Sequence, residues 1–211
     1  GQVLHTRENY VVEQAGLEYE LLNVKDIIAY ADTVSLQDVS GVLKEQIEKN
    51  YRIAQEGLAN DWGAAVGKTM INSEGNGIQT VAAAMAAAGS DARMNGCPMP
   101  VVINSGSGNQ GLTVSLPVIV YAREKGAAEE RLMRALCVSN LVAIHQKAYI
   151  GKLSAFCGAV CAAAGAVAGI AYLQGASYEV IDQAIINTIS NVGGMVCDGA
   201  KSSCAGKIAT A

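Results

Sequence analysis

One segment without charge limits the possible folds of this chain more than any other feature. Residues 153–178 include no Asp, Glu, Lys or Arg, and such a segment must be buried either in a bilayer or in a protein core. Its length is sufficient to span a bilayer. However, it consists mostly of Ala, Gly and Val between Cys157 and Leu173, and it lacks the Leu-rich run and aromatic belt of a membrane span. We therefore predict a helix buried inside a protein, with no membrane association.

The rest of the composition predicts the same kind of core. Of the 211 residues, 51% are hydrophobic and only 5% are aromatic, so Ala, Val, Ile, Leu and Met must fill the interior. A chain of this length can bury a substantial core. We predict a mainly α fold, a compact bundle of small-residue-rich helices with a short N-terminal β element.

The pattern along the chain divides it into two parts. Residues 1–22 read as the end of a β-containing segment, with β-rich runs at 3–5 and 10–13, and residues 23–211 read as one helical domain. The predicted helices begin near Asn23 and cover residues 24–31, 37–57, 78–88, 116–122, 128–150, 153–173 and 178–189. Because the chain starts at Gly1 and stops just beyond a cysteine-rich motif, we expect it to be truncated at both ends.

Charge and cysteine content exclude some functions. The net charge is −4 and the Lys and Arg residues are scattered, so the chain has no broad basic field for a phosphate backbone. Nucleic acid is therefore excluded as a partner. Six cysteines without a signal-peptide pattern are typical of a reducing compartment, and we predict a cytoplasmic protein.

One pair of cysteines has the sequence context of a metal ligand. Six small, polar or flexible residues separate Cys197 from Cys204, as expected of a loop that wraps a metal and donates amides to sulfur. Buried free cysteines in an Ala-rich core are the alternative. The C-x2-C pairs of common zinc sites are absent. Three thiolates on one cluster would instead leave an iron without a protein ligand, open to a substrate.

A glycine-rich run lies between an apolar, strand-like stretch and a helix. Such runs are often plain turns, but its amides are expected at a helix N-terminus, where carboxylates bind well. The run matches neither common nucleotide-binding pattern, so a small carboxylate is the better candidate ligand. The candidate substrate-binding residues are Asn104, Ser105, Gly106, Ser107, Gly108, Asn109 and Gln110.

Other catalytic arrangements have little support. His145 lies on the face of an apolar helix, and no Ser or Asp is placed by sequence to form a hydrolase triad with it. We interpret it as structural. A lysine could form a Schiff base with pyridoxal phosphate. No surrounding motif selects one for that role among Lys147, Lys152, Lys201 and Lys207.

Four stretches together resemble one family. They are residues 89–94 (GSDARM), 104–111 (NSGSGNQG), 153–158 (LSAFCG) and 197–205 (CDGAKSSCA). They are similar to the iron-sulfur L-cysteine desulfidases and the α chain of bacterial L-serine dehydratases, over most of the chain. The resemblance implies a [4Fe-4S] cluster on Cys157, Cys197 and Cys204, with Cys161 as the competing first ligand. The short gap between the last two cysteines is more similar to the desulfidase branch.

The same resemblance implies a lyase. Its substrate would be a small L-amino acid, most simply L-cysteine, converted to pyruvate, ammonia and sulfide; L-serine dehydration and non-catalytic amino-acid binding are the alternatives. In this reading Asn109 and Gln110 donate to the substrate. The family's N-terminal motif, which carries the cysteine proposed as base, is not in this chain, so no base is named. A homodimer, or pairing with that N-terminal segment, is the expected assembly.

Overall fold

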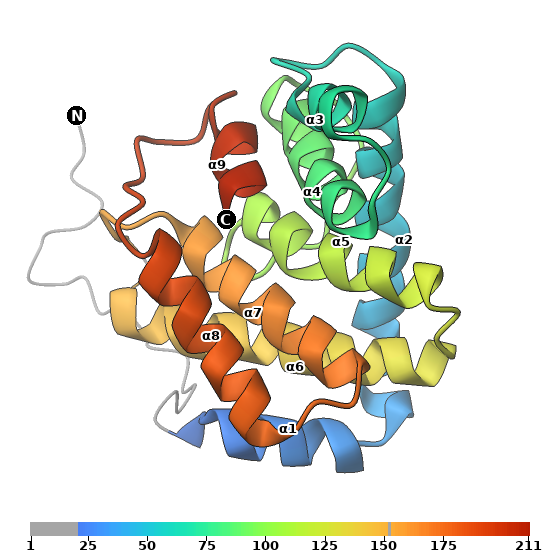
Figure 1. Ribbon diagram of the computed structural model, residues 1–211, viewed down its shortest axis with the longest axis vertical. Coiled ribbons are helices and arrows are strands. Elements are labelled where there is room, and N and C mark those ends of the chain that lie inside the picture. The colour runs from blue at the N-terminus through green and yellow to red at the C-terminus, as the bar shows by residue number, and fades with distance from the viewer. Residues whose placement is uncertain (1–20, 152) are drawn as a thin grey trace, which may run out of the picture.

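The computed structural model describes residues 21–151 and 153–211, and this part of the chain forms helices and no named strand (Figure 1). The prediction of a mainly α fold is confirmed. The expected β element lies outside the described residues. The helices are α1 (Val24–Thr33), α2 (Leu36–Ala59), α3 (Val66–Glu74), α4 (Ile78–Met94), α5 (Gly108–Glu124), α6 (Glu129–Ile150), α7 (Gly158–Leu173), α8 (Tyr178–Val192) and α9 (Cys204–Thr210).

Helix α7 packs against α5, α6 and α8, as Figure 1 shows. Its glycines allow the backbone of α6 to approach closely. A Cβ atom at Gly165 would lie 2.4 Å from the Ser139 carbonyl oxygen, and one at Gly169 would lie 2.9 Å from the Ala135 carbonyl oxygen. Because a larger residue at either position would displace a close-packed neighbour, the small-residue bias is a packing requirement. The prediction of a buried helix in the uncharged segment is confirmed, although the helix begins only at Gly158.

Helices α2 and α3 approach the backbone of α4 just as closely. A Cβ atom at Gly57 of α2 would lie 2.0 Å from the Ala88 carbonyl oxygen, and one at Gly67 of α3 would lie 2.2 Å from the Ala84 carbonyl oxygen. The alanines of α4 leave room for these neighbours. Helices α2, α3, α5 and α9 therefore pack around α4, and the backbones of α2 and α3 approach it closely at Gly57 and Gly67.

Several boundaries differ from the sequence prediction. Helix α4 does not stop near Gly89 but continues to Met94, because Gly89 faces Leu112 of α5, where a Cβ atom would meet the Leu112 Cδ2 atom at 3.2 Å. Gly89 makes room for a neighbouring helix and does not end α4, so the predicted helix end is wrong. Helix α5 begins within the glycine-rich run, at Gly108. Helices α3 and α9 were not predicted.

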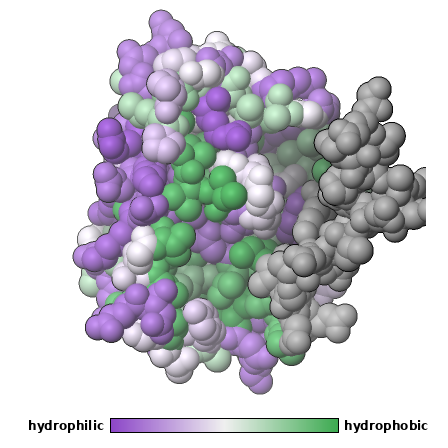
Figure 2. All heavy atoms as spheres, turned by 180° about the vertical axis from the view of Figure 1, so that it is seen from behind, coloured by the Kyte–Doolittle hydropathy of each residue, from purple (hydrophilic) through white to green (hydrophobic). Residues whose placement is uncertain are grey.

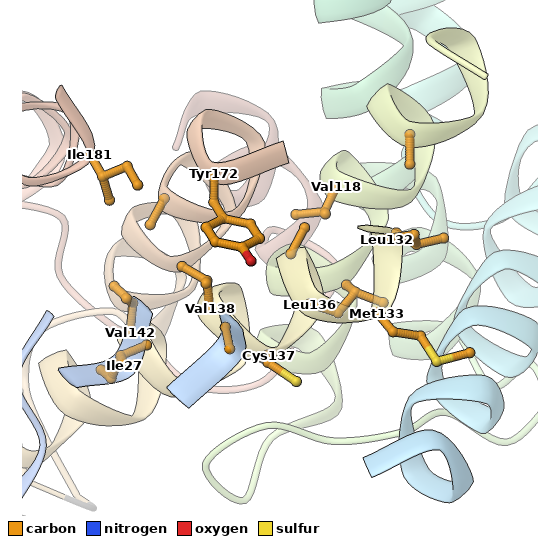
Figure 3. Close-up of a cluster of buried hydrophobic side chains, with 14 of the residues drawn as sticks. Ile27, Val118, Leu132, Met133, Leu136, Cys137, Val138, Val142, Tyr172 and Ile181 are labelled. Carbon is orange, nitrogen blue, oxygen red and sulfur yellow. The ribbon is translucent and has the colours of Figure 1, made fainter. Parts of the chain in front are cut away.

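Two large hydrophobic clusters and a small one fill the interior. The first joins α1, α2, α5, α6, α7 and α8, and Figure 3 shows the ring of Tyr172 pointing from α7 toward side chains of α5 and α6. The second joins α2, α4, α5, α7 and α9 around Leu112 and Leu116, and the partly buried Cys157 and Met195 pack against it. The second cluster therefore supports the region where the predicted metal ligands lie.

The surface of the described residues is mixed in character. Figure 2 shows hydrophobic side chains gathered near the centre of one face, between hydrophilic edges. Within residues 21–151 and 153–211, no helix combines the length and the apolar character needed to cross a bilayer.

Candidate functional site

Two predicted ligands lie on short segments that pair with each other. The Cys157 amide donates to the Met195 carbonyl oxygen at 2.8 Å, and the Cys197 amide donates to the Ala155 carbonyl oxygen at 2.8 Å. These two bonds flank an antiparallel bridge between Phe156 and Val196. The pairing brings together two parts of the chain that are far apart in sequence.

This pairing also determines where the side chains point. In an antiparallel pair, opposite residues share a face and successive residues alternate between faces. Cys157 and Cys197 therefore lie on the same face, and Phe156 and Val196 lie on the other. The bridge residues are exposed, at 50% and 59% respectively, and on the other face Cys157 is partly buried whereas Cys197 is exposed.

Cys157 has a second structural role at the start of α7. It is the N-cap residue of this helix, with no side-chain capping hydrogen bond. Burial raises the pKa of the Cys157 thiol most strongly, and the neighbouring Cys197 and Cys204 raise it further, whereas the Ala159 amide and Lys207 lower it. Cys197 and Cys204 are therefore near enough to Cys157 to affect the pKa of its thiol.

Cys204 is the first residue of α9, at the far end of the cysteine loop. Its thiol donates to the Gly199 carbonyl oxygen at 3.7 Å within that loop. Cys157 and Cys204 are partly buried and Cys197 is exposed, and none of the three is in a disulfide. Among the described residues, no three His, Cys, Asp or Glu side chains lie close enough together to hold a metal ion as they stand. The cysteines are neighbours, but their sulfurs have not converged.

Cys161 is placed differently from the other candidates. It is only 4% exposed inside α7, and burial raises its pKa. Cys161 lies one turn into α7, whereas the Cys157 amide is hydrogen-bonded to Met195, two residues before Cys197. Of the two candidate first ligands, Cys157 is therefore the one that lies with the cysteine loop.

The glycine-rich run forms a tight turn followed by the first turn of α5. Asn104 and Ser107 exchange backbone hydrogen bonds of 3.1 and 3.0 Å. Ser105 and Gly106 between them have φ values of +48° and +79°, as in a two-residue hairpin turn of type I′. Ser107 is the N-cap of α5, and its hydroxyl accepts from the Gln110 amide at 3.3 Å. The run is thus half turn and half helix.

Buried amides fix this turn to the helices behind it. Asn104 Nδ2 donates to Asn140 Oδ1 at 3.0 Å, and Asn140 exchanges two side-chain hydrogen bonds with Gln46 of α2. The Asn104 side chain is therefore engaged in holding the loop.

A second buried amide holds the segment before the turn. Asn50 is fully buried; its Oδ1 accepts from the Val102 amide at 2.8 Å, and its Nδ2 donates to the carbonyl oxygens of Val102 and Gly111. Gly111 permits this approach, because a Cβ atom there would lie 2.0 Å from the Val102 carbonyl oxygen.

The glycine-rich run and the metal candidates meet at one contact. A Cβ atom added to Gly158, the residue after Cys157, would lie 2.6 Å from Cδ and Nε2 of Gln110. Gln110 is 8% exposed, and its Oε1 has no hydrogen-bond partner among the described residues. Of the predicted substrate-binding side chains, Gln110 is the one that the structure brings against the cysteine region.

Other features are not part of this site. His145 is buried, and its ring packs edge-on against Tyr149 with centroids 5.2 Å apart; burial lowers its pKa. An open hollow of about 400 Å³ is lined by Arg131, Arg134 and Tyr172 among others, at the other end of α7 from Cys157. Both arginines there donate to backbone carbonyls at helix ends, which is a structural use.

Comparison with known proteins places this arrangement in a family. The profile of the serine dehydratase alpha chain matches residues 6–211. The chain belongs to the serine dehydratase alpha chain family. No solved structure matches it.

Several curated relatives carry the name UPF0597 protein. The one from Lachnoclostridium phytofermentans is 54% identical over 211 residues, which is 100% of this chain and 51% of the relative. The one from Treponema denticola is 51% identical over 195 residues, 90% of this chain and 45% of the relative. The one from Finegoldia magna is 48% identical over 210 residues, 100% of this chain and 50% of the relative. The chain spans about half the length of these curated relatives.

Two side chains near these cysteines and the glycine-rich run were not predicted as site residues. Lys207 of α9 donates to the Val196 carbonyl oxygen at 2.9 Å and to Asp198, and its charge acts on Cys157 and Cys197. The position of Lys207 three residues after Cys204 was the feature of the sequence that could have indicated it. Arg93 donates to Asn109 Oδ1 at 3.2 Å; it belongs to one of the motifs that carry the family resemblance.

Proposed function

We propose that this chain forms the cluster- and substrate-binding part of an iron-sulfur lyase that performs α,β-elimination on a small L-amino acid. The observation that carries this proposal is the placement of Cys157 and Cys197 on one face of paired segments, beside Cys204. The contact between Gln110 and Gly158 adds a substrate loop to the same region. Membership in the serine dehydratase alpha chain family supports an amino-acid dehydratase-like role.

The residues that would hold a [4Fe-4S] cluster are Cys157, Cys197 and Cys204. The donor set fits, since all three are free thiols and Lys207 supplies positive charge near Cys157 and Cys197. A cluster held by three cysteines would have one iron without a protein ligand, and that iron would supply a Lewis acid. Residues 198–203 are exposed, so this loop can move at little cost in packing to bring the sulfurs together. Free cysteines are typical of a reducing compartment, and we propose the cytoplasm.

The proposed reaction balances without a further oxidant or reductant. L-Cysteine loses its α-proton and its β-thiol as hydrogen sulfide to give 2-aminoacrylate, which tautomerises to an imine. Water hydrolyses the imine to pyruvate and ammonia. L-Serine gives the same products, with water leaving in place of hydrogen sulfide.

The part of this chain in that reaction is to bind and orient the amino acid. The first turn of α5 presents backbone amides toward the carboxylate, and the Asn104 and Asn50 networks keep this turn in place. No residue of this chain is assigned as the base that removes the α-proton. We propose that it comes from the N-terminal motif of the family, and that the chain pairs with that segment or with a second copy of itself.

L-Cysteine is the leading substrate in this proposal. The reason is the short gap between Cys197 and Cys204, which resembles the desulfidases. L-Serine is the second candidate, favoured by the description of the family. A comparison of the two with one enzyme preparation decides between them.

The test is a product assay on the full-length protein after anaerobic reconstitution with iron and sulfide. We expect pyruvate and ammonia from L-cysteine in equal amounts, with matching sulfide, and little product from D-cysteine. Pyruvate from L-serine alone would move the assignment to a dehydratase. Amino-acid binding without product from any substrate, in protein that holds its cluster, would contradict the lyase and favour a binding domain.

A further inference from the structure

Arg93 lies in the last turn of α4, where a cation is favoured, and its side chain reaches the N-terminus of α5, where an anion is favoured. Its guanidinium crosses the first residue of α5: a Cβ atom at Gly108 would lie 2.3 Å from Arg93 Nε and 2.8 Å from Cζ. The N-terminus of a helix carries partial positive charge and disfavours a cation. Among the described residues, no Asp or Glu forms an ion pair with Arg93, whose hydrogen bonds go to Asn109 Oδ1 and the Met94 sulfur.

Hydrogen-bonding capacity at the same helix end is also unused. Ser107 caps the Gln110 amide, whereas the amides of Gly108 and Asn109 have no acceptor within the described part of the chain. Such amides are a ready site for a carboxylate. In the same turn, the buried Gln110 side chain has an unpartnered Oε1, which is an acceptor for an N–H group of a ligand.

Contacts on both sides of the α5 N-terminus reach the segments that carry the cysteines. Arg93 is followed closely by Asn95, whose Oδ1 accepts from the Ser202 hydroxyl of the cysteine loop at 2.9 Å. On the other side of the turn, Gln110 rests on Gly158, beside Cys157. A ligand at the α5 N-terminus is therefore flanked by both cysteine-bearing segments.

We propose that Arg93 binds the α-carboxylate of the substrate, together with the free amides of Gly108 and Asn109. This inference rests on the proposed function and adds a specificity-determining residue to it. The planar guanidinium has five N–H donors and pairs with carboxylates through two parallel hydrogen bonds. One donor is used on Asn109 and others remain for a ligand. The site therefore selects free amino acids over ligands without a carboxylate.

The test is calorimetry with L-alanine, which has the carboxylate and amine of a substrate but no β-leaving group, on reconstituted full-length protein. L-Alaninamide, which lacks the carboxylate, is the matched ligand. We expect Arg93→Gln to weaken L-alanine binding by about 10- to 100-fold, the range for a lost charge-assisted hydrogen bond. Binding of L-alaninamide should be weak and should not change between the two proteins.

Two further variants guard against a simple folding defect. Gly108→Ala keeps the arginine but displaces its guanidinium, and we expect it to weaken L-alanine binding as well. Arg123→Gln is the control, because Arg123 lies at the other end of α5 over the Tyr51 ring; L-alanine binding should stay unchanged. Circular dichroism checks that each variant is folded.

The outcomes separate the two proposals. If folded Arg93→Gln binds L-alanine as the wild type does, the carboxylate assignment is wrong, whether or not the wild type makes pyruvate. If the wild type makes no pyruvate but binds L-alanine through Arg93, the lyase is wrong and the carboxylate site stands. Failure of the wild type to bind L-alanine at millimolar concentration would overturn the carboxylate site.

Discussion

Gln110 and Gly158 are in direct contact, and this contact joins the substrate loop to the helix that begins at Cys157. The space for the Gln110 amide exists only because residue 158 has no side chain: a Cβ atom would lie 2.6 Å from Gln110 Cδ and Nε2 and 3.0 Å from Oε1. The first turns of α5 and α7 are therefore fixed relative to each other. The proposed carboxylate site on one helix and the proposed cluster ligand on the other need this relationship to act on the same small molecule.

Gly158→Ala tests this contact. We expect the added methyl group to push the Gln110 side chain aside and to lower the free energy of unfolding by about 1–3 kcal/mol, as overpacking does. Urea denaturation measures it. The control is Gly41→Ala in α2, where an added Cβ atom meets nothing within 4 Å. We expect this substitution to stabilise the helix by about 0.5–1 kcal/mol. Equal effects of the two substitutions would show that Gln110 and Gly158 are not packed as described.

Asn50→Ala tests whether buried amides hold the loop. The substitution leaves the Val102 amide without its acceptor and the Val102 carbonyl oxygen without its donor, whereas the Gly111 carbonyl oxygen keeps the Ser115 hydroxyl; we therefore expect a loss of about 2–3 kcal/mol in the free energy of unfolding. Asn187→Ala is the matched control, since Asn187 is exposed and accepts only from Gln183; its effect should stay within about 0.5 kcal/mol. Thermal or urea unfolding distinguishes the two variants. An Asn50→Ala variant as stable as the wild type would show that Asn50 does not hold the loop.

Tyr172 predicts a loss of stability at high pH. Burial, followed by its hydrogen bond to Asp32, raises the pKa of Tyr172 to about 12. The folded state therefore holds the phenol proton more tightly than the unfolded state, whose tyrosine has a pKa near 10. The stabilisation is complete below about pH 10 and is lost as the pH rises toward about 12.

The measurement is the free energy of unfolding as a function of pH between 9 and 12. We expect Tyr172→Phe to show a smaller decline over this range than the wild type. Tyr149→Phe is the control, because Tyr149 is 76% exposed, and it should keep the decline of the wild type. The same decline in all three proteins would mean that Tyr172 ionises as it does in the unfolded chain.

The helical core follows from sequence more directly than the helix boundaries do. The missing charge and the Ala and Gly content of α7 predict a buried helix, because only close packing uses such residues well. Gly89 misled the prediction of the end of α4, since a glycine that makes room for Leu112 looks the same in sequence as one that ends a helix. The short helices α3 and α9 have too few residues for a clear apolar period.

The site could be predicted only in part for a similar reason. Motifs identified Cys157, Cys197, Cys204 and the run from Asn104 to Gln110, since their residue types and spacing are visible along the chain. The pairing of residues 155–157 with 195–197 and the approach of Arg93 to Gly108 depend on how distant segments meet. No local pattern encodes those contacts.

The most direct test of the central claim is the iron and labile-sulfide content after anaerobic reconstitution of the full-length protein and its single Cys→Ala variants. The account predicts about four iron and four sulfide per chain in the wild type, as in a [4Fe-4S] cluster, and in Cys161→Ala, because Cys161 is buried away from the cysteine loop. It predicts loss of most of both in Cys157→Ala, Cys197→Ala and Cys204→Ala. A wild type that takes up no iron, or a cluster that Cys161→Ala abolishes and Cys157→Ala retains, would contradict it.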